Sequence, residues 1–490
     1  MTTILILILA GILFLTAFIL LRALFFRAPA HRIQQGNLEE FFPNVITEAL
    51  SAAIRCRTIS DHDPSIVDPH TFLQLRVELQ KAFPRVHRTL ERIDLGTPSL
   101  VFHWKGTQSD LNPVVLTGHL DVVPVDPGTE SKWEHPPFSG EIADDFVWGR
   151  GAIDCKGQVV AILQAVEHLI GNGFKPARSI YLAFGHDEET SGIDGAPHIA
   201  AWMHQQGIRP EFVLDEGSAV VSGYIPGVTI PVGLVGVAEK GYLTLEIGVE
   251  DKGGHSALPP ASTVIGRLST AITHLESRPF PPHPGQLREL FRHIGENAPF
   301  YYRLVFANLW LFSPLANKMI SSLPETNAFI RTTCAVTMIS GGVRENVLPQ
   351  TASATLNMRL FPGDTVAEVC DRVRKVIADP LVTIKVLEGR AIEATDESPT
   401  DRASYQGIES AARQVFGNIP IAPNLIFGMT DARYYTLVTD QVYRFSPMLM
   451  TLEDVARVHG VNERISVEGL VNMARFYYVL LQDQVGEKVV

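Results

Sequence analysis

The chain has 490 residues, of which 46% are hydrophobic and 19% charged, so it is too long for one hydrophobic core and is neither disordered nor fibrous. The 41 Lys and Arg residues against 53 Asp and Glu residues give a formal net charge of −12, which argues against nucleic acid as a partner. The four cysteines form no CxxC pair, so they predict neither a disulfide framework nor a zinc finger.

The first predicted element is a long apolar helix. Residues 4–21 carry no charge, and four more apolar residues follow Arg22. About 20 apolar residues are needed to cross ~30 Å of hydrocarbon. No Lys or Arg precedes the run, and it exceeds the usual core of a signal peptide. We therefore predict a single-pass membrane anchor over residues 1–30, with a cleaved signal peptide as the alternative. We expect an extracytoplasmic catalytic domain, although the arginines after the run favour the opposite orientation.

Residues 38–236 are predicted to form the first part of an α/β catalytic domain. Helical apolar spacing marks residues 43–94, with Phe72, Leu75, Val77 and Leu79 on the buried face. Three β-rich runs follow at 114–116, 180–184 and 212–214, and a helical pattern covers 159–170. Strands that alternate with helices indicate a largely parallel sheet covered on both faces.

Residues 237–388 are predicted to form a second, smaller α+β domain. Strands at 243–249, 333–339, 352–360 and 382–387 and helices at 262–275 and 365–377 give the order β-α-β-β-α-β. An insertion at 279–330 is rich in large apolar residues. We expect this insertion to pack as core or against another subunit; the alternative is an apolar wall for an acyl chain or the bilayer surface. Residues 389–490 complete the catalytic domain and end in an amphipathic helix capped by Ser466.

Polar clusters follow the three β-rich runs of the catalytic domain. The clusters contain His119 and Asp121, Glu188 and Glu189, and Asp215 and Glu216, and the segment GRGAIDCKG adds Asp154. Ligands of open α/β sheets bind at the carboxyl ends of the strands. So many carboxylates at one edge require cations, and a mixed His and carboxylate set is typical of catalytic zinc. GRGAIDCKG lacks the third glycine and the βαβ spacing of a dinucleotide-binding fingerprint, so we do not expect a nucleotide.

Six segments occur in the order and spacing of a known family. They are TGHLDVVPV, GRGAIDCKG, GHDEETSG, LDEG, GGHSALPP and RVHGVNERI. The sequence resembles the aminoacylase/carboxypeptidase family of dinuclear zinc exopeptidases over roughly residues 40–485. It is most similar to the carboxypeptidase S-like branch, which includes the N-fatty-acyl-amino acid synthase/hydrolases. The resemblance implies a zinc-exopeptidase catalytic domain with a mixed sheet, and a lid and dimerisation domain at 237–388.

The resemblance also implies the metal ligands. One Zn²⁺ would be held by His119, Asp154 and Asp215, and the other by Asp154, Glu189 and His459, so that Asp154 bridges the two ions. Co²⁺ or Mn²⁺ could substitute. The peptide bond that follows the bridging aspartate is cis in this family, which here is the bond Asp154–Cys155.

Catalytic and substrate-binding roles follow from the same resemblance. Asp121 would fix the tautomer of the histidine ligand, and Glu188 would be the general base that activates the water between the metals. His255 would stabilise the tetrahedral oxyanion. Asn346 and Arg359 would grip the substrate carboxylate, with a surface salt bridge as the alternative role of Arg359.

The sequence therefore predicts a membrane-anchored, dinuclear zinc hydrolase. It would cleave an amide bond adjacent to a free carboxylate, in a small peptide or an N-acyl amino acid. The alternatives are a strict dipeptidase without lipid preference and a non-catalytic binding protein of the same fold. A homodimer through residues 237–388 is implied by the family, and a monomer is left open. The reaction direction and the exact substrate are left open too.

Overall fold

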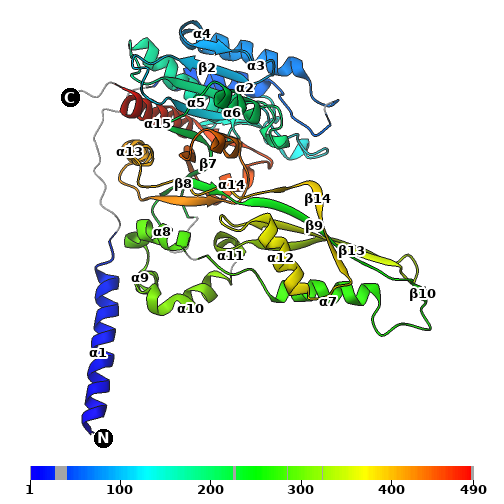
Figure 1. The fold of residues 1–490 in the computed structure, drawn as a ribbon. Helices are drawn as coiled ribbons and strands as arrows, with labels where there is room; N and C mark the ends of the chain where they lie inside the picture. Colours follow the sequence, from blue (N-terminus) through cyan, green and yellow to red (C-terminus); the bar gives the residue numbers. More distant parts are fainter. Residues whose placement is uncertain are drawn as a thin grey trace.

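The computed structural model describes residues 2–27, 41–63, 65–223, 228–283, 285–322 and 324–486. The expected boundaries at residues 30 and 38 lie outside these ranges. Figure 1 shows three parts: a large body (41–240 and 393–486), an arm that extends from it (241–283 and 333–392), and an apolar N-terminal helix that projects away from both. Residues 285–330, which we call the insertion, lie between the body and this helix (Figure 1).

The body is built on an eight-stranded mixed sheet in the order β1-β2-β6-β3-β7-β16-β8-β15. The strands are β1 (Glu91–Ile93), β2 (Leu100–Trp104), β3 (Val114–His119), β6 (Ile180–Gly185), β7 (Phe212–Val221), β8 (Val232–Glu239), β15 (Ile421–Ile426) and β16 (Val442–Met450). The central pairs β6/β3, β3/β7 and β7/β16 are parallel. The pairs β1/β2, β2/β6 and β7/β8 are antiparallel. The three predicted β-rich runs are confirmed as β3, β6 and β7.

Helices cover both faces of this sheet. On β3, Leu116 packs in the core formed with α2 (Pro43–Arg55), α5 (Lys156–Gly171), α13 (Ala403–Phe416) and α15 (Val467–Val485). The neighbouring Val115 packs on the opposite face, against α6 (Ala196–Gln205). This alternation is the two-residue period of a strand buried on both faces. The predicted cap of the last helix is confirmed, because Ser466 Oγ accepts a hydrogen bond from Gly469 N at 3.0 Å.

One side chain of the predicted N-terminal helical face is not buried. In α3 (Pro69–Ala82), Phe72, Leu75 and Leu79 are buried, whereas Val77 is 49% exposed. Val77 lies five residues after Phe72, which places it about 140° around the helix from the buried stripe.

The arm contains a four-stranded antiparallel sheet in the order β11-β13-β9-β14. Its strands are β9 (Gly241–Glu250), β11 (Thr333–Gly341), β13 (Thr351–Leu360) and β14 (Val382–Ile392), and its helices are α7 (Val264–Ser277) and α12 (Val366–Ile377). The predicted β-α-β-β-α-β order is therefore present. Leu243, Leu245 and Ile247 alternate along β9 and bury one face of the sheet under the two helices. The short strands β10 (Gly254–His255) and β12 (Val347–Leu348) pair near the far end of the arm (Figure 1).

The N-terminal helix α1 (Thr2–Leu24) is long and apolar enough to cross a membrane, and no other helix among the described residues is. A signal sequence meets the same criterion. The insertion forms α8 (Gly285–Ile294), α9 (Phe300–Phe306), α10 (Leu309–Ile320) and α11 (Pro324–Ile330). Leu290, Ile294 and Ile320 of the insertion pack against Leu234 and Leu425 of the body. Part of its apolar content thus forms core with the body sheet.

Candidate metal centre

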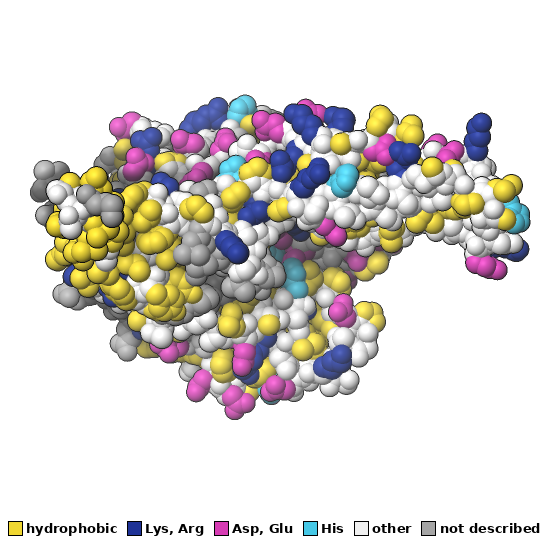
Figure 2. Space-filling view, turned by 90° about the horizontal axis from the view of Figure 1, so that it is seen from below, with side chains coloured by type: hydrophobic (Ala, Val, Ile, Leu, Met, Phe, Trp, Pro, Cys, Tyr) yellow, Lys and Arg dark blue, Asp and Glu magenta, His cyan; other side chains and the backbone are white. Residues whose placement is uncertain are grey.

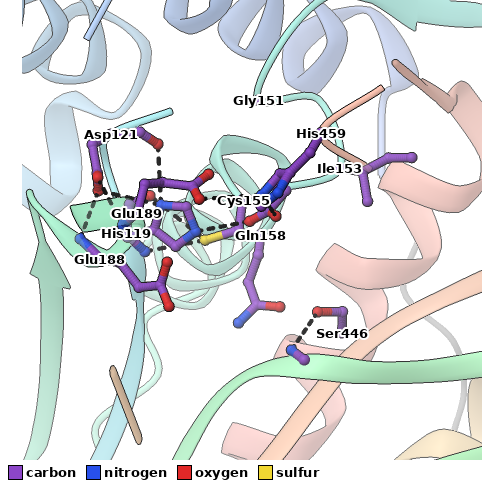
Figure 3. Close-up of polar contacts among 12 residues, drawn as sticks. His119, Asp121, Gly151, Ile153, Cys155, Gln158, Glu188, Glu189, Ser446 and His459 are labelled. Atoms are coloured by element: carbon purple, nitrogen blue, oxygen red, sulfur yellow. Dashed lines mark hydrogen bonds and ion pairs between the residues drawn. The ribbon is translucent and has the colours of Figure 1, made fainter. Parts of the chain in front are cut away.

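The polar clusters meet at one edge of the body sheet, as the sequence predicts. His119 is the last residue of β3, and Glu188 and Glu189 lie in the short 3-10 helix (Glu188–Thr190) that follows β6. Because β3 and β6 are parallel neighbours, their carboxyl ends bring these side chains together. Figure 3 shows His119, Glu188, Glu189 and His459 gathered around one space.

Asp154 lies between two imidazole rings. His119 Nε2 is 2.8 Å from Asp154 Oδ1, and His459 Nε2 is 3.0 Å from Asp154 Oδ2. His459 Nε2 is also 3.1 Å from Glu189 Oε2, and the ligand atoms of Asp154, Glu189 and His459 all lie within 4.8 Å of one another. A carboxylate with one oxygen toward each of two histidines has the geometry that a bridging ligand of two metals needs. The bond Asp154–Cys155 is cis, as expected.

The Asp121 carboxylate contacts both His119 and the turn that carries Glu188 and Glu189. Asp121 Oδ1 is 3.3 Å from Nδ1 of His119, the ring nitrogen that faces away from Asp154. Its two oxygens also accept hydrogen bonds from the backbone N–H groups of Glu188 (3.3 Å) and Glu189 (3.1 Å), and from Ser60 Oγ (2.6 Å). Burial alone would raise the pKa of Asp121, but hydrogen bonding and charge from His119 bring it below its ordinary value. An ionised Asp121 therefore orients the ring of His119, whose other nitrogen, Nε2, faces Asp154.

Asp215 and Glu216 are neighbours in β7, so their side chains point to opposite faces of the sheet. Burial raises the pKa of Glu216 well above its ordinary value, and the carboxylate of Asp154 adds to the increase while His119 opposes it. Burial also raises the pKa of Asp215, to about 6, and the charges acting on it include those of Glu239 and Arg444. The described ligand groups around Asp154 include neither Asp215 nor Glu216. The charges that act on Glu216 thus include those of Asp154 and His119, whereas those that act on Asp215 include Glu239 and Arg444.

Several buried carboxylate oxygens have no hydrogen-bond partner among the described residues. They include Asp187 Oδ1, Glu189 Oε1 and both oxygens of Asp215 and of Asp431. Uncompensated buried charge is costly, and divalent cations would offset it. Imidazole and carboxylate donors suit Zn²⁺, Co²⁺ or Mn²⁺. Cys155 lies beside His119 and Asp154; its Sγ accepts a hydrogen bond from the backbone N–H of His119 at 3.1 Å, and burial raises the pKa of its thiol well above the ordinary value.

An ion pair that the sequence did not single out ties the two metal-binding loops together. The Glu463 carboxylate is fully buried and accepts hydrogen bonds from the backbone N–H groups of Gly151 (3.0 Å), Ile153 (2.9 Å) and Asp154 (3.2 Å). Arg150 Nη1 donates to Glu463 Oε2 at 2.6 Å, and Arg150 Nη2 donates to the carbonyl oxygen of His459 at 3.0 Å. The pair therefore fixes the backbones that carry Asp154 and His459.

The predicted substrate-binding residues lie on the arm. His255 in β10 and Asn346 just before β12 are exposed near the far end of the arm, away from the centre within the same chain (Figure 1). Arg359 is near the opposite end of the arm, in β13, with its guanidinium 4.9 Å from the centre of the Tyr242 ring. Residues 427–435 (FGMTDARYY) contact the end of the 3-10 helix that carries Glu188 and Glu189, since Tyr434 Oη donates to the carbonyl oxygen of Ser191 at 2.5 Å.

Residues 115–483 match a family described as peptidase family M20/M25/M40. The chain is 40% identical over 443 residues to the N-fatty-acyl-amino acid synthase/hydrolase PM20D1 of Xenopus tropicalis, a match that covers 89% of this chain and 85% of the relative. It is 32% identical over 488 residues to carboxypeptidase S of Saccharomyces cerevisiae, which covers 89% of this chain and 84% of the relative. The names of both relatives describe a hydrolase or a peptidase. Both matches cover 89% of this chain.

Solved structures share the fold. An M20 family metallo-carboxypeptidase of Sulfolobus solfataricus superposes with a TM-score of 0.60 at 18% identity, over 89% of this chain and 98% of that one. Human carnosine dipeptidase 1 gives a TM-score of 0.56 at 16% identity, over 90% and 96% of the two chains. The likeness covers the body and the arm together.

Proposed function

The chain belongs to peptidase family M20/M25/M40 and is a hydrolytic metalloenzyme, and from this membership we propose that it is a membrane-anchored, two-zinc amidohydrolase. Its substrates would be N-acyl amino acids or small peptides, cleaved at the amide bond next to a free carboxylate. The observation that carries the proposal is Asp154 between the imidazoles of His119 and His459, at 2.8 Å and 3.0 Å.

The ligand set we propose differs from the sequence-based one at a single position. His119, Asp154 and Glu216 would hold the first metal. Glu216 takes the place of the expected Asp215 because the charges of Asp154 and His119 act on Glu216. Asp154, Glu189 and His459 would hold the second. When bound, two such ions polarise the scissile carbonyl and lower the pKa of water toward neutrality.

Glu188 would be the general base. Its backbone N–H is fixed by Asp121, and Figure 3 shows its side chain turned toward the same space as that of Glu189. Burial raises the pKa of Glu188 well above its ordinary value. A carboxylate with a raised pKa can take a proton from water and deliver it to the leaving nitrogen near neutral pH.

The arm would supply the substrate contacts. Arg359 presents a guanidinium that suits bidentate binding of a carboxylate. His255 and Asn346 lie too far along the arm to reach the centre of their own chain, so we propose that they complete the site of a second copy in a homodimer. One chain would then provide the metal centre and its partner the oxyanion donor.

The test is hydrolysis by the metal-loaded full chain. Long-chain N-acyl amino acids, dipeptides and the same compounds with an amidated carboxylate would be assayed in parallel. We expect hydrolysis of the free acids, and loss of activity after chelation. Cleavage of dipeptides alone would favour a strict dipeptidase, and no hydrolysis of any compound by a two-metal protein would contradict the proposal.

A further inference from the structure

The last turns of α1 are packed against the insertion, although the rest of the helix is exposed. Ile19, Ala23 and Phe26 are the residues of this helix and its following turn that are at least partly buried, and they lie on one helical face. Phe26 packs directly on Gly295, where a Cβ atom would collide with its ring. The helix therefore meets the folded chain along a defined face near its carboxyl end.

Polar contacts and an aromatic pair fix this packing. Arg22 Nε donates a hydrogen bond to the carbonyl oxygen of Ala307 at 3.0 Å, and Asn308 Nδ2 donates to the carbonyl oxygen of Ile19 at 3.1 Å. The rings of Phe18 and Trp310 lie edge to face, with centroids 6.5 Å apart. The junction of α9 and α10 is thus held at the level of residues 18–22 of α1.

The free part of α1 has the length of a bilayer core. Residues 2–18 are exposed on all sides, and at 1.5 Å per residue they extend about 25 Å, close to the ~30 Å of hydrocarbon in a membrane. If this part spans the bilayer, the hydrocarbon ends near Phe18. Figure 1 shows α9 and α10 beside the end of α1 nearest the body, where that boundary would lie.

The insertion exposes large apolar and aromatic side chains at this level. Phe300 is 39%, Tyr301 58%, Trp310 56% and Leu311 39% exposed. Figure 2 views the molecule from the side toward which α1 projects and shows hydrophobic side chains massed at the end of that face where α1 and the insertion lie together. Tyr and Trp are the residues enriched where a membrane protein meets the headgroups. The other side of the insertion is already packed on the body.

We propose that α9 and α10 form a membrane-resting surface, made by Phe300, Tyr301, Trp310 and Leu311, which lies in the lipid interface around α1. The partner is a lipid bilayer, because the surface continues the apolar exterior of α1 at the depth where the hydrocarbon ends. The orientation of this surface relative to the bilayer rests on the proposed anchoring by α1. The surface itself belongs to the folded chain and would contact lipid whether or not α1 is retained.

Trp310 provides a direct probe. The chain has five tryptophans; Trp104, Trp133 and Trp148 are buried and Trp202 is half-buried, so Trp310 is the exposed one. The full chain would be placed in phosphatidylcholine vesicles whose acyl chains carry bromine just below the headgroups. We expect quenching of a fluorescence component that Trp310→Phe removes and that the matched control Trp202→Phe keeps. Activity on a water-soluble substrate should be unchanged in both variants.

The outcomes separate this surface from the anchor. Carbonate extraction tests α1 alone: a chain released by carbonate would contradict the anchoring, and quenching of Trp310 by added vesicles would still support the surface. Equal bromine quenching in wild type and Trp310→Phe would overturn the surface. Iodide quenching of Trp310 in vesicles as strong as that of free tryptophan in water would also overturn it and would favour a protein partner.

Discussion

Replacing Glu463 by Gln tests whether the buried Arg150–Glu463 pair positions the metal ligands. Gln keeps an oxygen that can accept the three backbone N–H groups of residues 151–154. Its amide N–H₂, however, would face the Arg150 guanidinium, where Glu463 Oε2 now accepts a hydrogen bond at 2.6 Å. A hydrogen bond to a charged group contributes about 1.5–3 kcal/mol, and each 1.4 kcal/mol is a factor of ten.

If that loss acts on the loops that carry Asp154 and His459, zinc affinity should fall by about 10–100-fold, the range typical of residues that support metal ligands. Competition with a chromophoric chelator would measure the affinity. The matched control is Glu409→Gln, which removes another buried Arg–Glu contact, to Arg413 Nη2 at 3.5 Å, in a helix outside the metal loops. Equal zinc affinity in wild type and Glu463→Gln, at full occupancy of both sites, would refute the positioning role.

Four further predictions follow from the proposed site. Glu188→Gln should keep both metals but reduce kcat by several orders of magnitude. Loss of metal in that variant would mean that Glu188 is the metal ligand and Glu189 the general base. His255→Ala should lower kcat by roughly 10²–10³, and mixing it with the Glu188 variant should restore activity in heterodimers if the histidine acts across a dimer. Arg359→Ala should raise KM for free acids and have little effect on amidated analogues, which a steady-state comparison would test. Chelation should lower Tm, because a metal at 100 times its Kd stabilises the folded state by about 2.7 kcal/mol; an unchanged melting curve would argue against a bound metal.

Much of the site could be predicted from the sequence because its residues follow strands. His119, Glu188 and Glu189 come just after buried β-rich runs, and the edge of a parallel sheet brings such positions together. The choice between Asp215 and Glu216 depends on which face of β7 each residue occupies. The sequence gives their alternation, but not which of the two faces the metal ligands.

Other features depend on contacts between distant segments. Arg150 and Glu463 are 313 positions apart, and no local pattern marks either as part of a metal centre. The insertion likewise carried an apolar composition compatible with core, a subunit interface or a lipid surface. Its contacts with both the body and α1 became visible only in the folded chain.

Two metals at Asp154 would be seen directly in an anomalous difference map recorded at the zinc absorption edge from crystals of the metal-loaded protein. We expect two peaks flanking the Asp154 carboxylate, one against His119 and Glu216 and the other against Glu189 and His459. A single peak, or a peak bound by Asp215 with none beside Glu216, would contradict the proposed ligand set.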